Sequence, residues 1–258
     1  MRITTPVYAL YVRRLRRRLR GGALPRHIGL IMDGNRRWAR KAGLAGPSLG
    51  HRAGAEHVDD VLAWCESLGI RHVTVFVCST ENLARRGEAE VGFLMDLITQ
   101  VVTERLARPG ARWRLHVAGD LSVLPDRTAH ALKEAVDAGR EVTTGNHVTL
   151  AIGYGGRQEV VDAVRELLTE HAEEGRSLAD AAAAFEPADI ARHLWTAGHP
   201  DPDLVIRTSG EQRMSNFLLW QAAYAELYFC DAHWPAFREV DFLRALRSYA
   251  ARERRRGR

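Results

Sequence analysis

The sequence lacks the features that stabilise secreted proteins and those that anchor proteins across membranes. It has only three cysteines in 258 residues, and their spacing fits neither a disulfide framework nor a zinc motif. No apolar run approaches the ~20 residues of a membrane-spanning helix. The basic beginning of the chain also has no long apolar core, which a signal peptide requires. We therefore expect a cytoplasmic protein whose cysteines are reduced.

Acidic residues are missing from the first 20 positions, which contain seven arginines. The formal net charge of +5 is therefore a property of this segment, and we expect no nucleic-acid binding. Residues 6–20 can form a basic amphipathic helix with one apolar face: Tyr8, Val12, Leu15 and Leu19. We treat residues 1–22 as an arm. It could make peripheral contact with the anionic inner face of the cell membrane, pack on the chain's own core, or fray in solution.

Internal repeats and interdomain linkers are also absent from the sequence. A length of 258 residues, 46% of them hydrophobic, is ample for one large core. Expected strands and helices alternate, which predicts an α/β fold: a single domain with a mostly parallel central sheet of about six strands and helices on both faces. We assign residues 23–258 to this domain. The strands that we expect are 28–32, 71–78, 112–117, 147–152 and 204–206, followed by a helix and a last strand.

The richest chemistry follows the first expected strand. Its apolar run ends at Asp33, a turn with Gly34 comes next, and three arginines follow: Arg36, Arg37 and Arg40. Ligands of open α/β sheets bind at the carboxyl ends of strands. A carboxylate there, beside a glycine and arginines that fork onto phosphate, suits a metal-bound phosphate ester. An N-capping aspartate with a solvated basic first turn is the simpler alternative.

Two later strand ends carry polar groups as well. Residues 79–82 follow the second expected strand, and residues 207–216 follow the strand 204–206. The later stretch holds Arg207 and Arg213, with hydroxyl groups and a glycine between them. We interpret this pair as an anion clamp, because the planar fork of arginine binds phosphate oxygens in pairs. Ordinary turns with exposed arginines remain the alternative.

Residues 46–50 match the serine-hydrolase pattern G-x-S-x-G. That pattern requires a strand immediately before a strained turn at the serine. The residues before Ser48 are basic and rich in glycine and alanine, so we expect a loop that offers backbone N–H groups and His51 to phosphate. A purely structural histidine is the alternative. We attribute the glycines of residues 153–156 to close packing between a strand and a helix.

These stretches together resemble the cis-prenyltransferases, the undecaprenyl diphosphate synthase family. The resemblance spans about residues 25–237 and is unbroken over residues 207–221. The other matching positions are 27–39, Gly50, His51, Ser79, Glu81, Asn82, Arg85, 154–157, Glu226 and 234–237. The chain departs from the family pattern at Arg36, Leu83, Arg86 and Gly153, where a small residue, an aromatic residue, proline and asparagine are usual.

The resemblance implies a Mg²⁺-dependent transferase that joins isopentenyl diphosphate to an allylic diphosphate and makes a Z double bond. Asp33 would hold Mg²⁺ and help the diphosphate leave, and Glu226 would complete the Mg²⁺ site of isopentenyl diphosphate. Asn82, with Ser79, would take the proton, although an amide is a poor base and could instead position water or a diphosphate oxygen. The implied substrate-binding residues are Gly34, Asn35, Arg36, Arg37, Trp38, His51, Ser79, Thr80, Glu81, Arg85, Arg207, Arg213, Met214 and Ser215.

Arg36, Leu83 and Gly153 together resemble the short-chain actinobacterial branch, which makes Z,E-farnesyl diphosphate from geranyl diphosphate. We expect that product, and a long-chain synthase for the cell-wall lipid carrier is the alternative. A non-catalytic partner subunit would have lost the aspartate or the arginine clamp, which this sequence keeps. The resemblance also implies a homodimer in which residues 255–257 reach the partner's site. The D-D-x-x-D motif of all-helical prenyltransferases is absent from the sequence.

Overall fold

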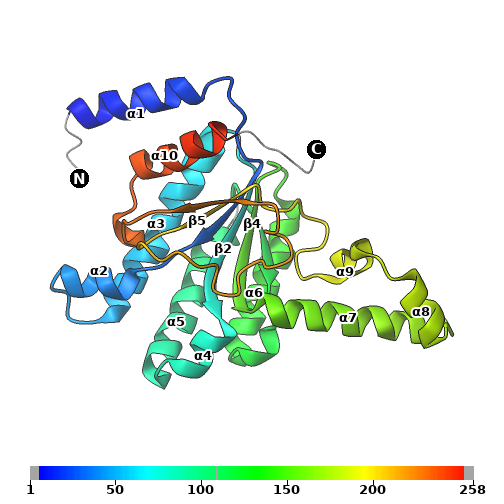
Figure 1. Cartoon of the computed structure of the whole chain (residues 1–258). Helices are drawn as coiled ribbons and strands as arrows, with labels where there is room; N and C mark the ends of the chain where they lie inside the picture. The colour runs from blue at the N-terminus through cyan, green and yellow to red at the C-terminus, as the bar shows by residue number, and fades with distance from the viewer. Residues whose placement is uncertain (1–5, 109, 253–258) are drawn as a thin grey trace.

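The computed structural model describes residues 6–108 and 110–252, and a parallel sheet forms its centre (Figure 1). The strand order is β3-β4-β2-β1-β5-β6, and every pairing is parallel. This architecture confirms the predicted α/β fold with about six mainly parallel strands. The strands are β1 (His27–Ile31), β2 (His72–Ser79), β3 (Arg114–Ala118), β4 (His147–Tyr154), β5 (Leu204–Arg207) and β6 (Glu226–Phe229).

The helices alternate with the strands as far as β5. They are α1 (Pro6–Leu19), α2 (Asn35–Lys41), α3 (Pro47–Ser67), α4 (Thr80–Arg85), α5 (Glu88–Val101), α6 (Asp126–Ala138), α7 (Gly156–Glu173), α8 (Leu178–Ala184), α9 (Pro187–His193) and α10 (Glu239–Ala250). Helix α5 continues into one π-helical turn (Val102–Leu106). The helix predicted between β5 and β6 is wrong: residues 208–225 form turns. Positive φ angles at four positions explain this, because they cannot continue a right-handed helix: Ser209, Ser215, Asn216 and Leu218.

The two faces of the sheet are covered differently. Alternate strand residues such as Leu30 and Ile206 join the larger core, which helices α3, α5, α6 and α10 complete. On the other face, Val205 and Phe217 of the 208–225 turns belong to a smaller apolar cluster, against which Phe76 packs. The rings of Phe76 and Phe217 stack with centroids 4.7 Å apart. Helix α7 extends away from the sheet and packs against α9 (Figure 1).

Helix α1 packs on α10 rather than standing free (Figure 1). Its residues Val12, Leu15 and Leu19 are buried, and Arg16 Nε lies 2.6 Å from Glu239 Oε1. The apolar face that the sequence predicts is therefore used within the chain, in agreement with the alternative of a helix packed on its own core. Across the part of the chain that the structure describes, no helix combines the length and apolar character needed to cross a membrane.

The register of the central strands brings the polar strand ends to one edge. Ile31 of β1 pairs with Arg207 of β5 on one side and with Phe76 of β2 on the other. Neighbouring strands lie about 4.8 Å apart. The residues that follow β1, β2 and β5 therefore meet at the carboxyl edge of the sheet. Histidines, in contrast, begin β1, β2 and β4 at the opposite edge.

His27, at the start of β1, is held without charge in the core. It is 4% exposed, with Nδ1 at 2.6 Å from the Pro200 carbonyl oxygen and Nε2 at 2.8 Å from Thr74 Oγ1. Burial lowers the pKa of His27 to about 4, and the neighbouring His72 adds to this effect. The Pro200 carbonyl and Asp203 oppose the shift without reversing it.

His27 should make the fold sensitive to acid. Its pKa is about 6.5 in an unfolded chain and about 4 when folded. The unfolded state therefore binds more protons between these values, and stability is lost as the pH falls through this window. From pH 7.5 to 5.0, wild type should lose about 2 kcal/mol more free energy of unfolding than His27→Gln. Urea unfolding at both pH values measures this loss. The exposed His130 supplies the control: His130→Gln should lose as much free energy of unfolding between the two pH values as wild type does. Equal losses in wild type and His27→Gln would contradict the low pKa of His27.

Candidate active site

Asp33 and Arg207 meet at the carboxyl edge of the sheet. Arg207 Nη2 donates a hydrogen bond to Asp33 Oδ2 at 2.8 Å, and Arg37 Nη2 donates to Oδ1 at 3.2 Å. Burial by itself would raise the pKa of Asp33, but the hydrogen bonds and charges of Arg207 and then Arg37 outweigh it and lower that pKa. Asp33 is therefore an ionised carboxylate at neutral pH, with 28% of its side chain exposed.

Arg207 also fixes the turn that follows it. Its side chain is 5% exposed, and its guanidinium donates hydrogen bonds to Ser215 Oγ, at 2.8 Å, and to the backbone carbonyl of Arg213. Thr208 Oγ1 donates to the Asp33 carbonyl at 2.7 Å. The segment predicted as an anion clamp is thus folded back onto Asp33 by one buried arginine.

Gly34 makes the tight turn between β1 and α2 possible. Its φ is 102°, in the region that favours glycine. A Cβ at this position would lie 2.9 Å from both His233 Nδ1 and Ser209 Cβ. Ser209 also accepts a hydrogen bond from Arg37. The Asp33 turn is therefore packed closely between the 208–225 turns and the loop before α10.

Two cavities with mostly polar linings lie on either side of Asp33 and Met32, which line both. The larger, of about 630 Å³, lies at the ends of β1, β2 and β5. Its polar lining includes Ser79, Glu81, Asn82, Arg85, Arg213 and Ser215. The smaller, of about 350 Å³, is lined by Gly34, Asn35, Arg36, Arg37, Arg40 and His51. One ionised carboxylate thus stands between two sets of cations, which suits two anionic groups held side by side.

A narrow apolar cavity continues from the smaller polar one. Its volume is about 80 Å³, and it runs between helices α3 and α5 and the sheet. It shares Met32, Asn35 and His51 with the polar cavity. Its apolar walls include Val58, Leu62, Leu94, Ile98, Leu106 and Leu150. The arrangement fits a molecule with an anionic head and an apolar chain.

Glu90 organises the basic side of the smaller cavity, and its role was not predicted from the sequence. Its Oε1 lies 3.1 Å from His51 Nε2 and 3.8 Å from the Nε atoms of both Arg36 and Arg86. Burial lowers the pKa of His51, although Glu90 opposes that shift. The sequence pointed to this ion-pair cluster only through Arg86, which stands where the family usually has proline. Arg86 lines both polar cavities.

Most of the predicted site residues line these cavities, but four do not: Trp38, Thr80, Met214 and Glu226. Ser79 and Glu81 also have defined structural contacts. Ser79 Oγ accepts the backbone N–H of Asn82 at 3.1 Å, and Glu81 Oε1 accepts from Asn216 Nδ2 at 3.0 Å. These bonds fix the beginning of α4 beside the larger cavity.

Glu226 does not join Asp33 within one chain. It begins β6 opposite Leu204, which pairs with Ile28 at the beginning of β1. Asp33 lies five residues beyond Ile28, about 16 Å farther along the strand direction. The Glu226 carboxylate is paired with Arg252. Glu226 of the same chain is therefore too far from Asp33 to share a metal ion with it, and its role in the Mg²⁺ site of isopentenyl diphosphate stays a prediction.

The ionised Asp33 carboxylate is the group at this edge that fits a magnesium ion. Among residues 6–108 and 110–252, the buried Asn35 Oδ1 and Arg207 Nε have no hydrogen-bond partner. Mg²⁺ prefers oxygen ligands and is usually held by one or two carboxylates together with substrate phosphates. Asp33 supplies an ionised carboxylate, and the arginines that line the two cavities can hold the phosphates.

Gly34→Ala should destabilise the protein more than Gly43→Ala. Both glycines have positive φ, which costs a residue with a Cβ about 1–2 kcal/mol. Only Gly34 adds close contacts, because nothing lies within 4 Å of a Cβ at Gly43. We expect an additional loss of about 2 kcal/mol in the free energy of unfolding of Gly34→Ala, measured by urea titration. Equal losses in the two variants would contradict the packing role of Gly34.

Comparisons with known proteins identify the family of this chain. Residues 31–257 match the family model described as "Putative undecaprenyl diphosphate synthase". An isoprenyl transferase of Streptomyces fradiae is 70% identical over 258 residues, all of both chains. The (2Z,6E)-farnesyl diphosphate synthase of Thermobifida fusca is 52% identical, over 98% of this chain and 97% of that protein. A short-chain Z-isoprenyl diphosphate synthase of Mycobacterium bovis is 49% identical, over 100% and 98%.

A solved structure is similar as well. The crystal structure of lavandulyl diphosphate synthase from Lavandula x intermedia, in complex with dimethylallyl diphosphate, has a TM-score of 0.81 and 34% identity. The match covers 90% of this chain and 97% of that one. The fold, the paired cationic cavities around Asp33 and these relatives lead to one conclusion: the chain belongs to the cis-prenyltransferase family of enzymes.

Proposed function

We propose that this enzyme condenses isopentenyl diphosphate with geranyl diphosphate, in a Mg²⁺-dependent reaction, to form Z,E-farnesyl diphosphate. The observation that carries the proposal is the position of Asp33. It lies between two polar cavities that arginines line, and one of them opens into an apolar channel. A reaction that joins two diphosphates and extends an apolar chain needs these three spaces next to one another.

The smaller cavity is the better place for the allylic diphosphate. Arg36, Arg37, Arg40 and His51 line it, and its apolar continuation begins at Met32. The diphosphate would lie among the arginines, which bind phosphate oxygens in pairs. The prenyl chain would then enter the space between α3 and α5, where burial of its apolar surface contributes to binding.

The larger cavity would hold isopentenyl diphosphate. Arg213, Arg85 and Ser215 line it. Arg207 Nε, which has no partner among the described residues, is a further donor beside Asp33. Binding of a diphosphate there would direct its C=C bond toward the allylic carbon near Asp33. The two cavities thereby convert a bimolecular encounter into a reaction between neighbouring groups.

The bond between the allylic carbon and its diphosphate oxygen breaks, and the C=C bond of isopentenyl diphosphate supplies the electron pair for the new C–C bond. The arginines stabilise the negative charge that develops on the departing diphosphate. Mg²⁺, when bound, supplies further charge neutralisation at those oxygens. Asn82, held beside Ser79, would position the water or phosphate oxygen that accepts the proton.

The short product is supported by the channel and by the relatives. The apolar cavity is small, and Leu83 packs against the core that forms its wall. The Thermobifida fusca relative is named a (2Z,6E)-farnesyl diphosphate synthase, and the Mycobacterium bovis relative a short-chain synthase. The long-chain synthase remains the competing product class, and the assay below distinguishes the two.

The other classes have less support. Ser48 lies in the first turn of α3, and the described segment between α2 and α3 contains no strand. The strained turn of a serine hydrolase is therefore missing. A non-catalytic subunit is disfavoured because Asp33, Arg207 and Arg213 all line the larger cavity.

Two associations complete the proposal. The homodimer that the family resemblance implies is supported by exposed apolar side chains on the 208–225 turns, where Tyr224 is 89% exposed. Peripheral membrane contact is supported by the outer side of α1, where Val7 and Leu10 are exposed beside several arginines. The expected partner-site ending, residues 255–257, lies outside the described residues.

The product assay tests the proposal. Purified protein is incubated with Mg²⁺, radiolabelled isopentenyl diphosphate and either geranyl or farnesyl diphosphate, and chain length is read by chromatography. We expect a single fifteen-carbon Z product from geranyl diphosphate and none from Asp33→Asn. A ladder that reaches fifty carbons would move the enzyme to the long-chain class. No product from either primer would contradict a catalytic role.

Arg213→Ala should mainly weaken binding of isopentenyl diphosphate. A charged hydrogen bond to phosphate contributes about 1.5–3 kcal/mol, and Arg213 is well exposed, so we expect KM for isopentenyl diphosphate to rise about tenfold. KM for the allylic primer should change little. Arg165→Ala is the matched control, because Arg165 is an exposed arginine of α7 that pairs with Asp162. An unchanged KM in Arg213→Ala would remove this residue from the isopentenyl diphosphate site.

A further inference from the structure

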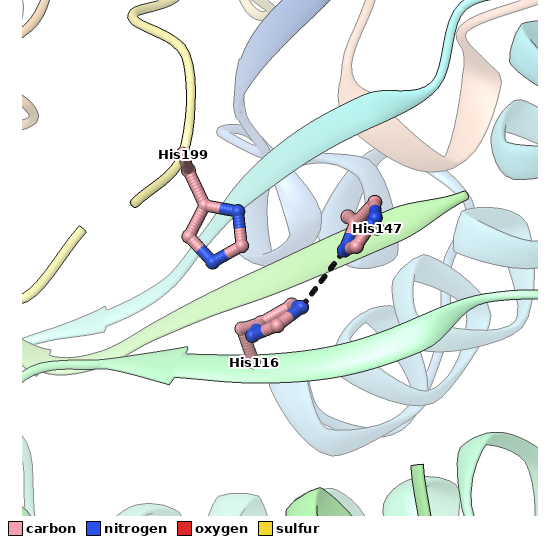
Figure 2. Close-up of side chains that lie close together, drawn as sticks. All are labelled: His116, His147 and His199. Carbon is pink, nitrogen blue, oxygen red and sulfur yellow. Dashed lines mark hydrogen bonds between the residues drawn. The ribbon is translucent and has the colours of Figure 1, made fainter. Parts of the chain in front are cut away.

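A cluster of histidines lies at the amino edge of the sheet, away from Asp33. His147 begins β4, and His116 lies in the middle of β3, the neighbouring strand. His199 joins them from the loop before β5. Figure 2 shows the three side chains gathered over the two strands. None of them lines the cavities around Asp33.

The three rings are close enough to share one ion. His116 Nε2 lies 3.0 Å from His147 Nδ1, and the rings of His116 and His199 have centroids 4.2 Å apart (Figure 2). One ring nitrogen from each histidine lies within 4.8 Å of the other two. Metal–nitrogen bonds of about 2.0–2.1 Å in a tetrahedral site place ligand nitrogens about 3.3 Å apart. Small rotations of the rings therefore suffice to direct all three at a common point.

The backbone beside His199 is anchored. Pro200 follows it directly, and the Pro200 carbonyl oxygen lies 2.6 Å from His27 Nδ1. His27 Nε2 is occupied by Thr74 Oγ1, so both nitrogens of His27 already have partners. His27 thus serves to hold the loop that carries His199, and the other two histidines are fixed by strand pairing. A site built from two strands and an anchored loop needs little reorganisation to bind a ligand.

The imidazoles are uncharged at neutral pH and can act as ligands. Burial lowers the pKa of all three imidazoles. For His116, burial and the charges of His199 and His147 together lower the pKa to about 4. Neutral imidazole suits Zn²⁺, Ni²⁺, Co²⁺ and Cu²⁺. Arg114 lies close enough to lower the same pKa values and would also oppose a dication. We therefore expect affinity on the order of micromolar, weaker than in structural zinc proteins.

We propose that His116, His147 and His199 form a binding site for a divalent transition-metal ion, for which Zn²⁺ is the probe. Three protein ligands leave a coordination position for water. The ion would link β3, β4 and the loop before β5 at the edge of the sheet opposite the reaction. Its role is to stabilise the fold, since the residues that contact substrate lie at the other edge.

The test uses tag-free, full-length protein freed of metal by chelator dialysis. Calorimetric titration with Zn²⁺ should show one site per chain in wild type. His199→Ala should bind at least tenfold more weakly, and Zn²⁺ should raise the melting temperature of wild type by several degrees but not that of the variant. Because His199 lies in a loop, this variant is the one least expected to disturb folding. Co²⁺ should give visible absorption bands in wild type that His147→Gln loses.

Two controls separate this site from others. His130→Ala removes an exposed histidine of α6 that has only Glu134 as a partner in the described structure, and it should bind Zn²⁺ as wild type does. Asp33→Asn should also keep the site, since Asp33 lies at the other edge of the sheet. Retention of Zn²⁺ binding by both His199→Ala and His147→Gln would overturn the proposal. So would the absence of a wild-type site tighter than about 100 μM, which would leave a hydrogen-bonded histidine cluster without a metal.

Discussion

The ion pair between Asp33 and Arg207 is the interaction on which the rest of the site depends. Each residue lies at the carboxyl end of a central strand, and the parallel register brings the two ends together. A buried guanidinium needs a charged partner, and the carboxylate that we propose as the Mg²⁺ ligand must stay ionised. The hydrogen bond from Arg207 to Asp33 provides the charged partner and keeps the carboxylate ionised. Because Arg207 also binds Ser215 and the Arg213 carbonyl, the same residue sets the shape of the cavity that we assign to isopentenyl diphosphate.

The unequal covering of the sheet explains how one site can hold an amphiphilic substrate. Helices α3 and α5 leave a narrow apolar space against one face, and the arginines gather where the strands end. Met32, directly before Asp33, lines all three cavities and so marks the boundary between the two environments. The three histidines of the cluster at the amino edge of the sheet line none of these cavities. The histidine cluster at that edge therefore does not change the cavities around Asp33.

The sequence predicted what depends on local pattern. Apolar runs predicted five strands to within a few residues, and polar residues at their ends placed Asp33, Asn82 and Arg207 at one edge. Contacts between segments that are distant in the chain could not be predicted from the sequence. Glu90 was missed because its role appears only when α5 lies beside His51. The helix expected before β6 was wrong because positive φ angles interrupt that segment. Glu226 was matched by motif, but its distance from Asp33 is set by strand register.

A crystal structure of the protein with Mg²⁺, isopentenyl diphosphate and an unreactive thio analogue of geranyl diphosphate would show where each of the two diphosphates binds relative to Asp33. We expect the diphosphate of the analogue among Arg36, Arg37 and His51, with its prenyl chain between α3 and α5. Isopentenyl diphosphate should contact Arg207, Arg213 and Ser215, with Asp33 between the two head groups. A prenyl chain outside the apolar channel, or a diphosphate bound away from Asp33, would contradict this arrangement.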